Sequence, residues 1–265
     1  MPPQVQTGGD CRTRSLFDIL KIHGPLERQP NIFDRLGEND RKRVFSRICR
    51  LSLEAKSLLF LQGERHEGIY IIESGLIRTF YTSPIGREIT LAYWQPGNFV
   101  GGPDVFGEST HMWSGMAVKP STLIAIKGDE LRTLTEEIPQ LAIGIIEALV
   151  YKGRCFSALI QMLGTRSVSE RLAQLLLMLI ESHGEPDRRG GIAIQRQFTH
   201  EDLAHMVGAS RQWVTTSLDR LQHQGVVHIR KRQVVVLRPD LLAGRVGHHV
   251  SVPHKFHRSS DVPLG

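Results

Sequence analysis

Polar side chains that can hydrogen-bond to nucleic-acid bases gather between residues 198 and 224. Thr199, followed three residues later by Asp202, is typical of a capped helix start, and apolar residues then recur at helical spacing. Gly208 permits a tight turn, after which Ser210 can cap a second helix. The apolar spacing of that second helix turns a polar set outward near its N-terminal end, namely Arg211, Gln212, Thr215 and Thr216.

This order of caps, turn and outward polar side chains predicts a helix-turn-helix. In such a motif the second helix presents its N-terminal side chains to base edges in the major groove of double-stranded DNA. The alternative is an ordinary pair of amphipathic helices with solvated polar faces. The coincidence of two caps, a glycine turn and a polar cluster in one short segment favours the helix-turn-helix.

Two β-branched runs in residues 226–237 flank the basic residues Arg230, Lys231 and Arg232. Because Gly225 can end the preceding helix, these runs predict a β-hairpin wing beside the helix-turn-helix. Basic side chains at its tip can contact phosphates, which adds affinity but no sequence information. A solvated charged turn is the alternative. The predicted DNA-binding set is Thr199, Ser210, Arg211, Gln212, Thr215, Thr216, Arg230, Lys231 and Arg232.

The composition sets limits on the rest of the function. The chain has 265 residues and a formal net charge of +6, with its basic excess in the C-terminal third, which suits a polyanionic partner. Cys11, Cys49 and Cys155 are widely separated, so we expect a reducing cytoplasm and no disulfide, zinc or iron–sulfur framework. No apolar stretch is long enough to cross a membrane, and no signal sequence is evident.

Sequence motifs for catalysis are missing as well. No nucleophile elbow, phosphate loop or paired-carboxylate motif occurs, so we expect no catalytic residues, no cofactor, no metal and no enzyme activity. His248, His249, His254 and His257 lack a carboxylate or cysteine scaffold, which favours a flexible tail over a metal site.

The segment from Leu51 to Ile126 consists of short apolar runs separated by glycine. Gly63, Gly75, Gly86 and Gly97 recur at intervals of 11 or 12 residues. Turn signals at that spacing predict an all-β barrel or sandwich.

A long helix is predicted between residues 139 and 163. One apolar seam on it has spacings of four and three residues, typical of a coiled coil: Leu141, Ile145, Ala148, Lys152, Cys155, Leu159 and Met162. A second stripe, comprising Ile143, Ile146 and Val150, is expected to pack on the β domain. Two apolar faces need two partners, so we predict a homodimer through 139–163, along the first seam. A helix buried within one protomer is the alternative.

These patterns divide the chain into five parts. We expect an N-terminal arm at 1–30, a β domain at 31–135, a dimerisation helix at 136–164, a DNA-binding domain at 165–240 and a flexible tail at 241–265. Within the DNA-binding domain, residues 169–182 predict a further amphipathic helix and 184–191 predict a loop.

From about Phe33 to Leu237 the sequence resembles the CRP/FNR family of bacterial transcription regulators. The most specific matches are Gly86 to Gly101, the long helix and Ser210 to Thr216. The resemblance implies an α+β fold with an N-terminal β-roll, a jelly roll like that of cyclic-nucleotide-binding domains, then a long dimerisation helix and a C-terminal winged helix-turn-helix. It also implies RNA polymerase as a partner.

The family's DNA contacts carry over to three residues. By analogy Arg211, Gln212 and Thr216 take the base-reading positions, with Arg211 pairing with a guanine and Gln212 with an adenine. Thr216 stands where close family members often carry arginine, which implies a different half-site.

The sensor end departs from the family members that bind cyclic AMP. Their ribose-binding Gly-Glu-Leu segment is replaced by Gly101-Gly102-Pro103-Asp104, and their phosphate-binding Arg-Ser pair by Met112-Trp113-Ser114-Gly115. A buried phosphate without a cation would be costly, so cyclic AMP binding is disfavoured. The expected effector pocket for another small molecule comprises Gly101, Gly102, Asp104, Trp113 and Ser114, with His111 expected to be a loop residue and not a ligand. Two alternatives stay open: a small-molecule-binding sensor that acts through protein contacts, and a ligand-independent regulator that is controlled by its abundance.

Overall fold

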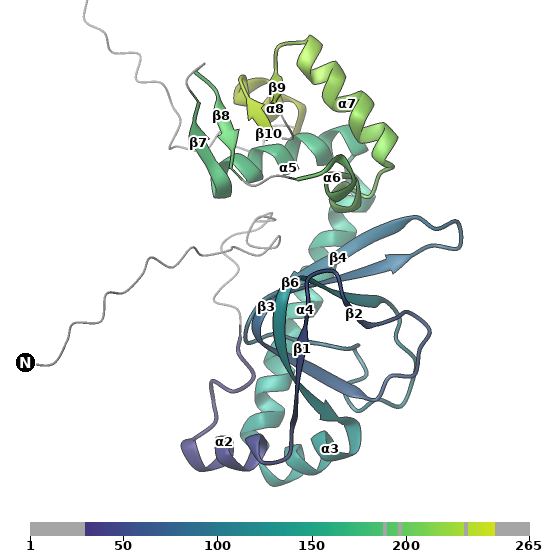
Figure 1. Ribbon diagram of the computed structural model, residues 1–265, viewed down its shortest axis with the longest axis vertical. Coiled ribbons are helices and arrows are strands. Elements are labelled where there is room, and N and C mark those ends of the chain that lie inside the picture. The colour runs from purple at the N-terminus through teal and green to yellow at the C-terminus, as the bar shows by residue number, and fades with distance from the viewer. Residues whose placement is uncertain (1–29, 188–189, 196–197, 231–232, 247–265) are drawn as a thin grey trace, which may run out of the picture.

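The computed structural model describes residues 30–187, 190–195, 198–230 and 233–246. Figure 1 shows a β-rich N-terminal part, the long helix α4 beside it, and a C-terminal part built of helices and a small sheet. The α+β fold with a β-roll, a long helix and a winged helix-turn-helix is therefore confirmed. Residues 1–29 of the predicted arm, and residues 247–265 with their four histidines, lie outside the described residues.

Antiparallel strands form the β-roll. The sheet order is β1-β6-β3-β4, with β2 also paired to β6 and β5 to β3. The strands are β1 (Cys49–Leu53), β2 (Leu58–Phe60), β3 (Gly68–Thr82), β4 (Glu88–Trp94), β5 (Phe99–Val100) and β6 (Ser114–Lys127).

The recurring glycines have the backbone conformation that the turn prediction required. All four have a positive φ, between 76° and 100°. At Gly75, which lies at a register irregularity inside β3, a Cβ would stand 2.1 Å from the Ser121 hydroxyl oxygen. A side chain is thus excluded there by both backbone conformation and space.

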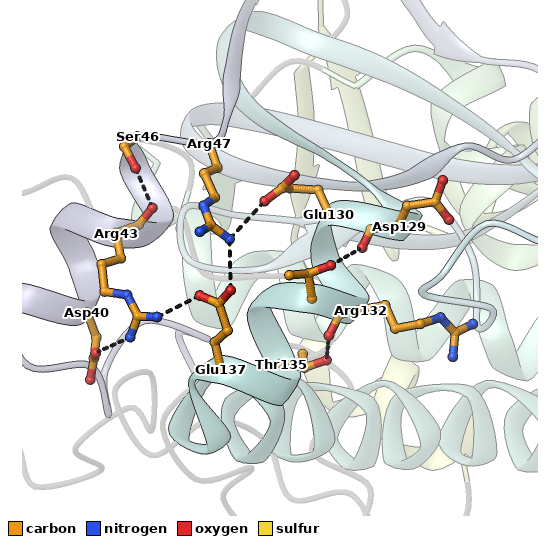
Figure 2. A network of polar contacts seen from close by, with 10 residues as sticks. Asp40, Arg43, Ser46, Arg47, Asp129, Glu130, Arg132, Thr135 and Glu137 are labelled. Atoms are coloured by element: carbon orange, nitrogen blue, oxygen red, sulfur yellow. Dashed lines mark hydrogen bonds and ion pairs between the residues drawn. The ribbon is translucent and has the colours of Figure 1, made fainter.

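Helices α2 (Glu38–Phe45) and α3 (Gly128–Glu137) are joined by the polar network in Figure 2. Arg43 donates to the Glu137 carboxylate at 2.6 Å, and Arg47 lies 3.3 Å from Glu130 and 3.4 Å from Glu137. These pairs are partly exposed, so each is worth little alone, but together they hold α2 against the helix that leads into α4.

Helix α4 (Pro139–Thr165) packs against its own protomer with the face that the sequence analysis assigned to the dimer. The seam predicted for the dimer, comprising Leu141, Ile145, Ala148, Lys152, Cys155, Leu159 and Met162, is buried within the protomer. The stripe predicted to pack on the β domain is the exposed one, with Ile146 59% and Val150 52% accessible. The predicted assignment of the two faces was wrong, and the alternative of burial within one protomer holds for the first seam.

The local fit explains which face packs inward. A Cβ on Gly144 would lie 2.4 Å from the Ile32 carbonyl oxygen, so only glycine lets the chain before α2 cross α4 this closely. Ile32 then joins Leu141 and Ile145 in one core cluster with Ile124 and Ile126 of β6. The close approach of the Ile32 backbone to Gly144 fixes the rotation of α4 about its axis. The spacing of hydrophobic residues does not encode this contact.

The C-terminal part is a winged helix-turn-helix carried on α5 (Val168–His183). Its sheet has the order β7-β8-β10-β9. The remaining elements are β7 (Gly184–Pro186), β8 (Ile192–Ile194), α6 (His200–Val207), α7 (Arg211–His223), β9 (Val227–Arg230), β10 (Gln233–Val236) and α8 (Pro239–Val246).

Two boundaries differ from the sequence expectation. The segment 184–191, expected to be a loop, begins with β7, which pairs with β8. Residues 241–246, expected to belong to a flexible tail, are helical in α8, where Leu242 and Val246 are buried and the helix packs on α5. Only two residues of α8 are buried, and two apolar positions are too few to predict a helix from their spacing.

Candidate DNA-binding surface and sensor interior

Capping interactions set the geometry of the helix-turn-helix. The Thr199 hydroxyl accepts from the Asp202 amide at 3.0 Å, while the Asp202 carboxylate accepts from the Thr199 amide at 2.8 Å. Gly208 ends α6 with φ 63°, and the Ser210 hydroxyl accepts from the Trp213 amide at 3.1 Å. Thr199 and Ser210 therefore fix the starts of α6 and α7 through their side chains.

Helix α7 buries Val214, Leu218 and Leu221 and leaves its N-terminal polar side chains outside. Arg211, Gln212 and Thr216 are exposed. Thr215 differs, because it is half-buried and its hydroxyl donates to the Arg211 carbonyl at 3.0 Å and lies 2.8 Å from His200 Nδ1. His200, which sequence reasoning missed, thus links α6 to α7 beside the exposed side chains.

The wing is partly described. Strands β9 and β10 pair antiparallel, with Arg230 exposed opposite Gln233, and Gln222 of α7 accepts from the Ile229 amide at 2.8 Å. Lys231 and Arg232 lie outside the described residues. The bond from Gln222 holds the wing at a set position relative to α7.

The space between the β-roll and α4 is filled by aromatic side chains. The Trp94 indole donates to the Thr79 hydroxyl at 2.9 Å and meets Phe156 edge-on, with ring centroids 6.3 Å apart. The Trp113 ring also contacts Phe156, with ring centroids 5.6 Å apart. Only Trp113 of these residues was predicted to line an effector pocket.

The other predicted pocket residues have partners outside this aromatic cluster. Gly101 and Gly102 pack against His66, and the Asp104 carboxylate accepts from the Glu108 amide at 2.9 Å. The Ser114 hydroxyl accepts from the Gln62 amide at 3.0 Å. His111, expected to be a loop residue, is 3% exposed and stacks on Phe60 in the roll interior with centroids 4.1 Å apart.

Comparison with known proteins identifies both parts of the chain. The family profile of the cyclic nucleotide-binding domain matches residues 50–137, and that of the Crp-like helix-turn-helix domain matches residues 170–245. The chain belongs to the CRP/FNR family. It is therefore a transcription regulator with a DNA-binding helix-turn-helix and a sensor domain of the cyclic-nucleotide-binding fold.

Relatives and solved structures agree with this assignment. The cyclic AMP receptor protein of Thermus thermophilus is 29% identical over 184 residues, which cover 69% of this chain and 82% of the relative. The global nitrogen regulator of Nostoc sp. is 24% identical over 194 residues, covering 72% and 86%. The structure of the c-di-GMP-responsive global regulator CLP of Xanthomonas campestris has a TM-score of 0.66 at 22% identity, covering 76% of this chain and 99% of that one.

These relatives are transcription regulators and not enzymes. Among the described residues, none of the helices combines the length and the apolar character that crossing a membrane requires.

Sensor and DNA-binding module touch through β4 and α6. Glu88, at the start of β4, accepts from Arg78 at 2.8 Å and lies 3.8 Å from His205 Nε2 on α6. Burial, followed by the Arg78 charge, lowers the pKa of His205. The Glu88 carboxylate is thus shared between the two parts of this CRP/FNR regulator.

Lys152 is a buried basic side chain in the sensor interior. Its Nζ lies 3.6 Å from the Trp94 ring centroid and 4.5 Å from that of Phe99, so the two aromatic faces surround the amine. Burial lowers the pKa of Lys152 from 10.5 to about 7. At neutral pH a large fraction of the folded molecules therefore carries a neutral amine here.

We predict that Lys152→Met raises the free energy of unfolding by about 1 to 3 kcal/mol at pH 7, because methionine fills the site without a buried amine. Between pH 7 and 10.5 the unfolded chain binds a proton that the folded chain has released, so wild-type stability rises with pH in this window. The advantage of the variant should consequently shrink towards pH 10. Urea unfolding at several pH values measures this, and a constant difference at every pH would contradict it.

Proposed function

We propose that the chain is a homodimeric regulator that binds a palindromic site in double-stranded DNA through α7, and that a signal other than cyclic AMP, received in the β-roll, controls it. The observation that carries this proposal is the exposed polar surface of Arg211, Gln212 and Thr216 on a helix whose other face is buried. Family membership supports the cytoplasm as its compartment and RNA polymerase as a partner.

The roles of the individual DNA contacts follow from their positions. Arg211 and Gln212 lie in the first turn of α7, where a recognition helix meets base edges, and Arg211 can donate two hydrogen bonds to a guanine. Thr199, Ser210 and Thr215 use their side-chain oxygens within the motif, so we propose that they act by positioning α7. Arg230, Lys231 and Arg232 would contact phosphates.

We predict that Arg211→Ala weakens binding to the best site by about 1 to 3 kcal/mol and relaxes the preference at one guanine in each half-site. Selection of bound sequences from a random pool, followed by titration of the selected site, measures both effects. Arg220→Ala, at the exposed C-terminal end of the same helix, is the matched control and should leave base preference unchanged. An equal loss of affinity for all sequences would contradict this prediction and would show that Arg211 contacts a phosphate.

The exposed stripe of α4 is the surface that we propose for dimerisation. Ile143, Ile146, Val150 and Ile160 are its exposed apolar side chains. With Gly153, Ser157 and Gly164 they alternate spacings of three and four residues, as a two-stranded coiled coil requires. A Cβ on Gly153 would meet nothing within 4 Å in one protomer, so this position is open to a second helix. A second copy of α4 supplies the same stripe through a twofold axis.

We predict that Ile160→Glu gives folded monomers that no longer bind the palindrome tightly, because a charge enters the seam and the avidity of two linked half-site contacts is lost. Leu159→Glu, one residue away on the buried face, should instead destabilise the protomer. Sedimentation velocity and circular dichroism on both variants separate the two faces. An intact dimer in the Ile160 variant would remove this stripe from the interface.

The proposed exclusion of cyclic AMP has an electrostatic basis. Residues 88–118 contain no lysine or arginine, while Asp104 and Glu108 place carboxylates in the loop that follows β5. Two basic side chains are buried in the described part of the sensor: the Lys152 amine is enclosed by Trp94 and Phe99, and Arg78 is paired with Glu88. A cyclic phosphate in this interior would have no available counter-charge.

We therefore predict that titration calorimetry with cyclic AMP or cyclic GMP shows no saturable heat at millimolar ligand, and that DNA affinity is the same with and without either nucleotide. The second candidate is a cyclic-nucleotide-activated regulator, favoured by the domain profile and by relatives named for cyclic AMP. A micromolar dissociation constant would decide for that candidate.

A further inference from the structure

The β-roll interior contains a histidine with no polar partner. His66 is 1% exposed, and within the part of the chain that the structure describes neither of its ring nitrogens has a hydrogen-bond partner. Leaving a buried polar group unpaired costs about 1 to 3 kcal/mol. Such a ring persists where something other than the protein's own groups binds it.

A second imidazole lies beside it. The rings of His66 and His111 have centroids 4.6 Å apart, and His111 Nδ1 is 3.0 Å from the Gly101 carbonyl oxygen. A carbonyl only accepts, so Nδ1 carries the proton and Nε2 of His111 keeps its lone pair. Metal-bound histidines are held in this way, with the second ring nitrogen donating to a backbone carbonyl.

Acidic side chains near the two histidines favour a bound cation over an anion. Asp104 acts electrostatically on His66, and Glu64 acts on His111. Both rings are buried, with His66 1% and His111 3% exposed, so each is shielded from bulk water. Gly101 and Gly102 border His66, with their would-be Cβ atoms 3.0 and 3.3 Å from Nε2, so a side chain at either position would crowd that nitrogen.

We infer that His66, His111 and Asp104 form a binding site for a divalent first-row transition metal ion inside the β-roll. Two histidines and one carboxylate are a known ligand set for such ions, with further positions open to water or another ligand. Among the described residues no three such side chains are already gathered. Asp104 therefore has to turn towards the histidines from its present partners, the Glu108 and Phe106 amides and the Ser109 hydroxyl.

Metal binding at this place would reach the dimer helix. Asp104 is followed by Val105, which belongs to the same core cluster as Leu141 and Ile145 of α4, and by Phe106, whose carbonyl lies against Gly128 at the start of α3. Turning Asp104 therefore moves a loop that packs on both helices. This inference rests on the proposed sensor role of the β-roll. The metal ion would be either the signal itself or the group that binds the signal molecule.

The test is a Co²⁺ titration of the chelator-treated full chain, followed by visible absorption. One Co²⁺ per protomer is expected, with binding abolished in His66→Ala and in His111→Ala and weakened at least about 10-fold in Asp104→Asn. The matched controls should bind as the wild type: His205→Ala, and a chain with asparagine at positions 248, 249, 254 and 257. No Co²⁺ binding by the wild type at millimolar metal, or unchanged binding in both histidine variants, would overturn the site.

A second measurement leaves the three proposed ligands unsubstituted. Pulsed electron paramagnetic resonance of Cu²⁺ bound to the tail-substituted chain should show coupling to two imidazoles, and coupling to none or one would overturn the site. DNA binding measured on the same samples separates the proposals. Absence of metal binding by the wild-type chain with DNA binding retained rejects this site alone, whereas metal binding by the wild-type chain without DNA binding rejects the proposed function alone.

Discussion

The packing of one face of α4 against the β-roll is the interaction on which the other features depend. It buries Leu141, Ile145 and Ala148 in the cluster shared with β6 and α3, and Cys155 and Leu159 in the cluster that continues into the DNA-binding module. Because a single continuous helix enters both clusters, a displacement at one end is transmitted along its length. The same packing determines which side chains are left for a second protomer.

A second connection runs beside the helix. Glu88 at the start of β4 pairs with Arg78 within the sensor and faces His205 on the first helix of the helix-turn-helix. On α5, Arg171 is buried, and its guanidinium donates to the Leu163 carbonyl at 3.3 Å while the positive charge of Arg87 also acts on it. The contact between the sensor and the DNA-binding module therefore brings like charges together as well as opposite ones. Such a contact is weak enough to separate and specific enough to favour one arrangement.

The sequence was informative where local chemistry decides structure. Caps at Thr199 and Ser210 and the turn at Gly208 are specified by neighbouring residues, so the helix-turn-helix could be predicted in detail. The recurring glycines predicted the strands of the roll for the same reason. The rotation of α4 could not be predicted, because both of its stripes are apolar and the choice depends on the approach of Ile32 to Gly144. His66 and His111 lie far apart in sequence, and only the pairing of strands and loops brings their rings together.

The enclosure of the Lys152 amine between Trp94 and Phe99 also has an optical consequence. An ammonium group over an indole ring shifts the energy of the excited state, and its deprotonation or withdrawal removes that field. The chain thus carries an intrinsic fluorophore at the junction of helix and roll, while another of its three tryptophans, Trp213, lies on the recognition helix. Emission from Trp94 would follow the junction itself, so rearrangement of the sensor can be observed in the unlabelled protein.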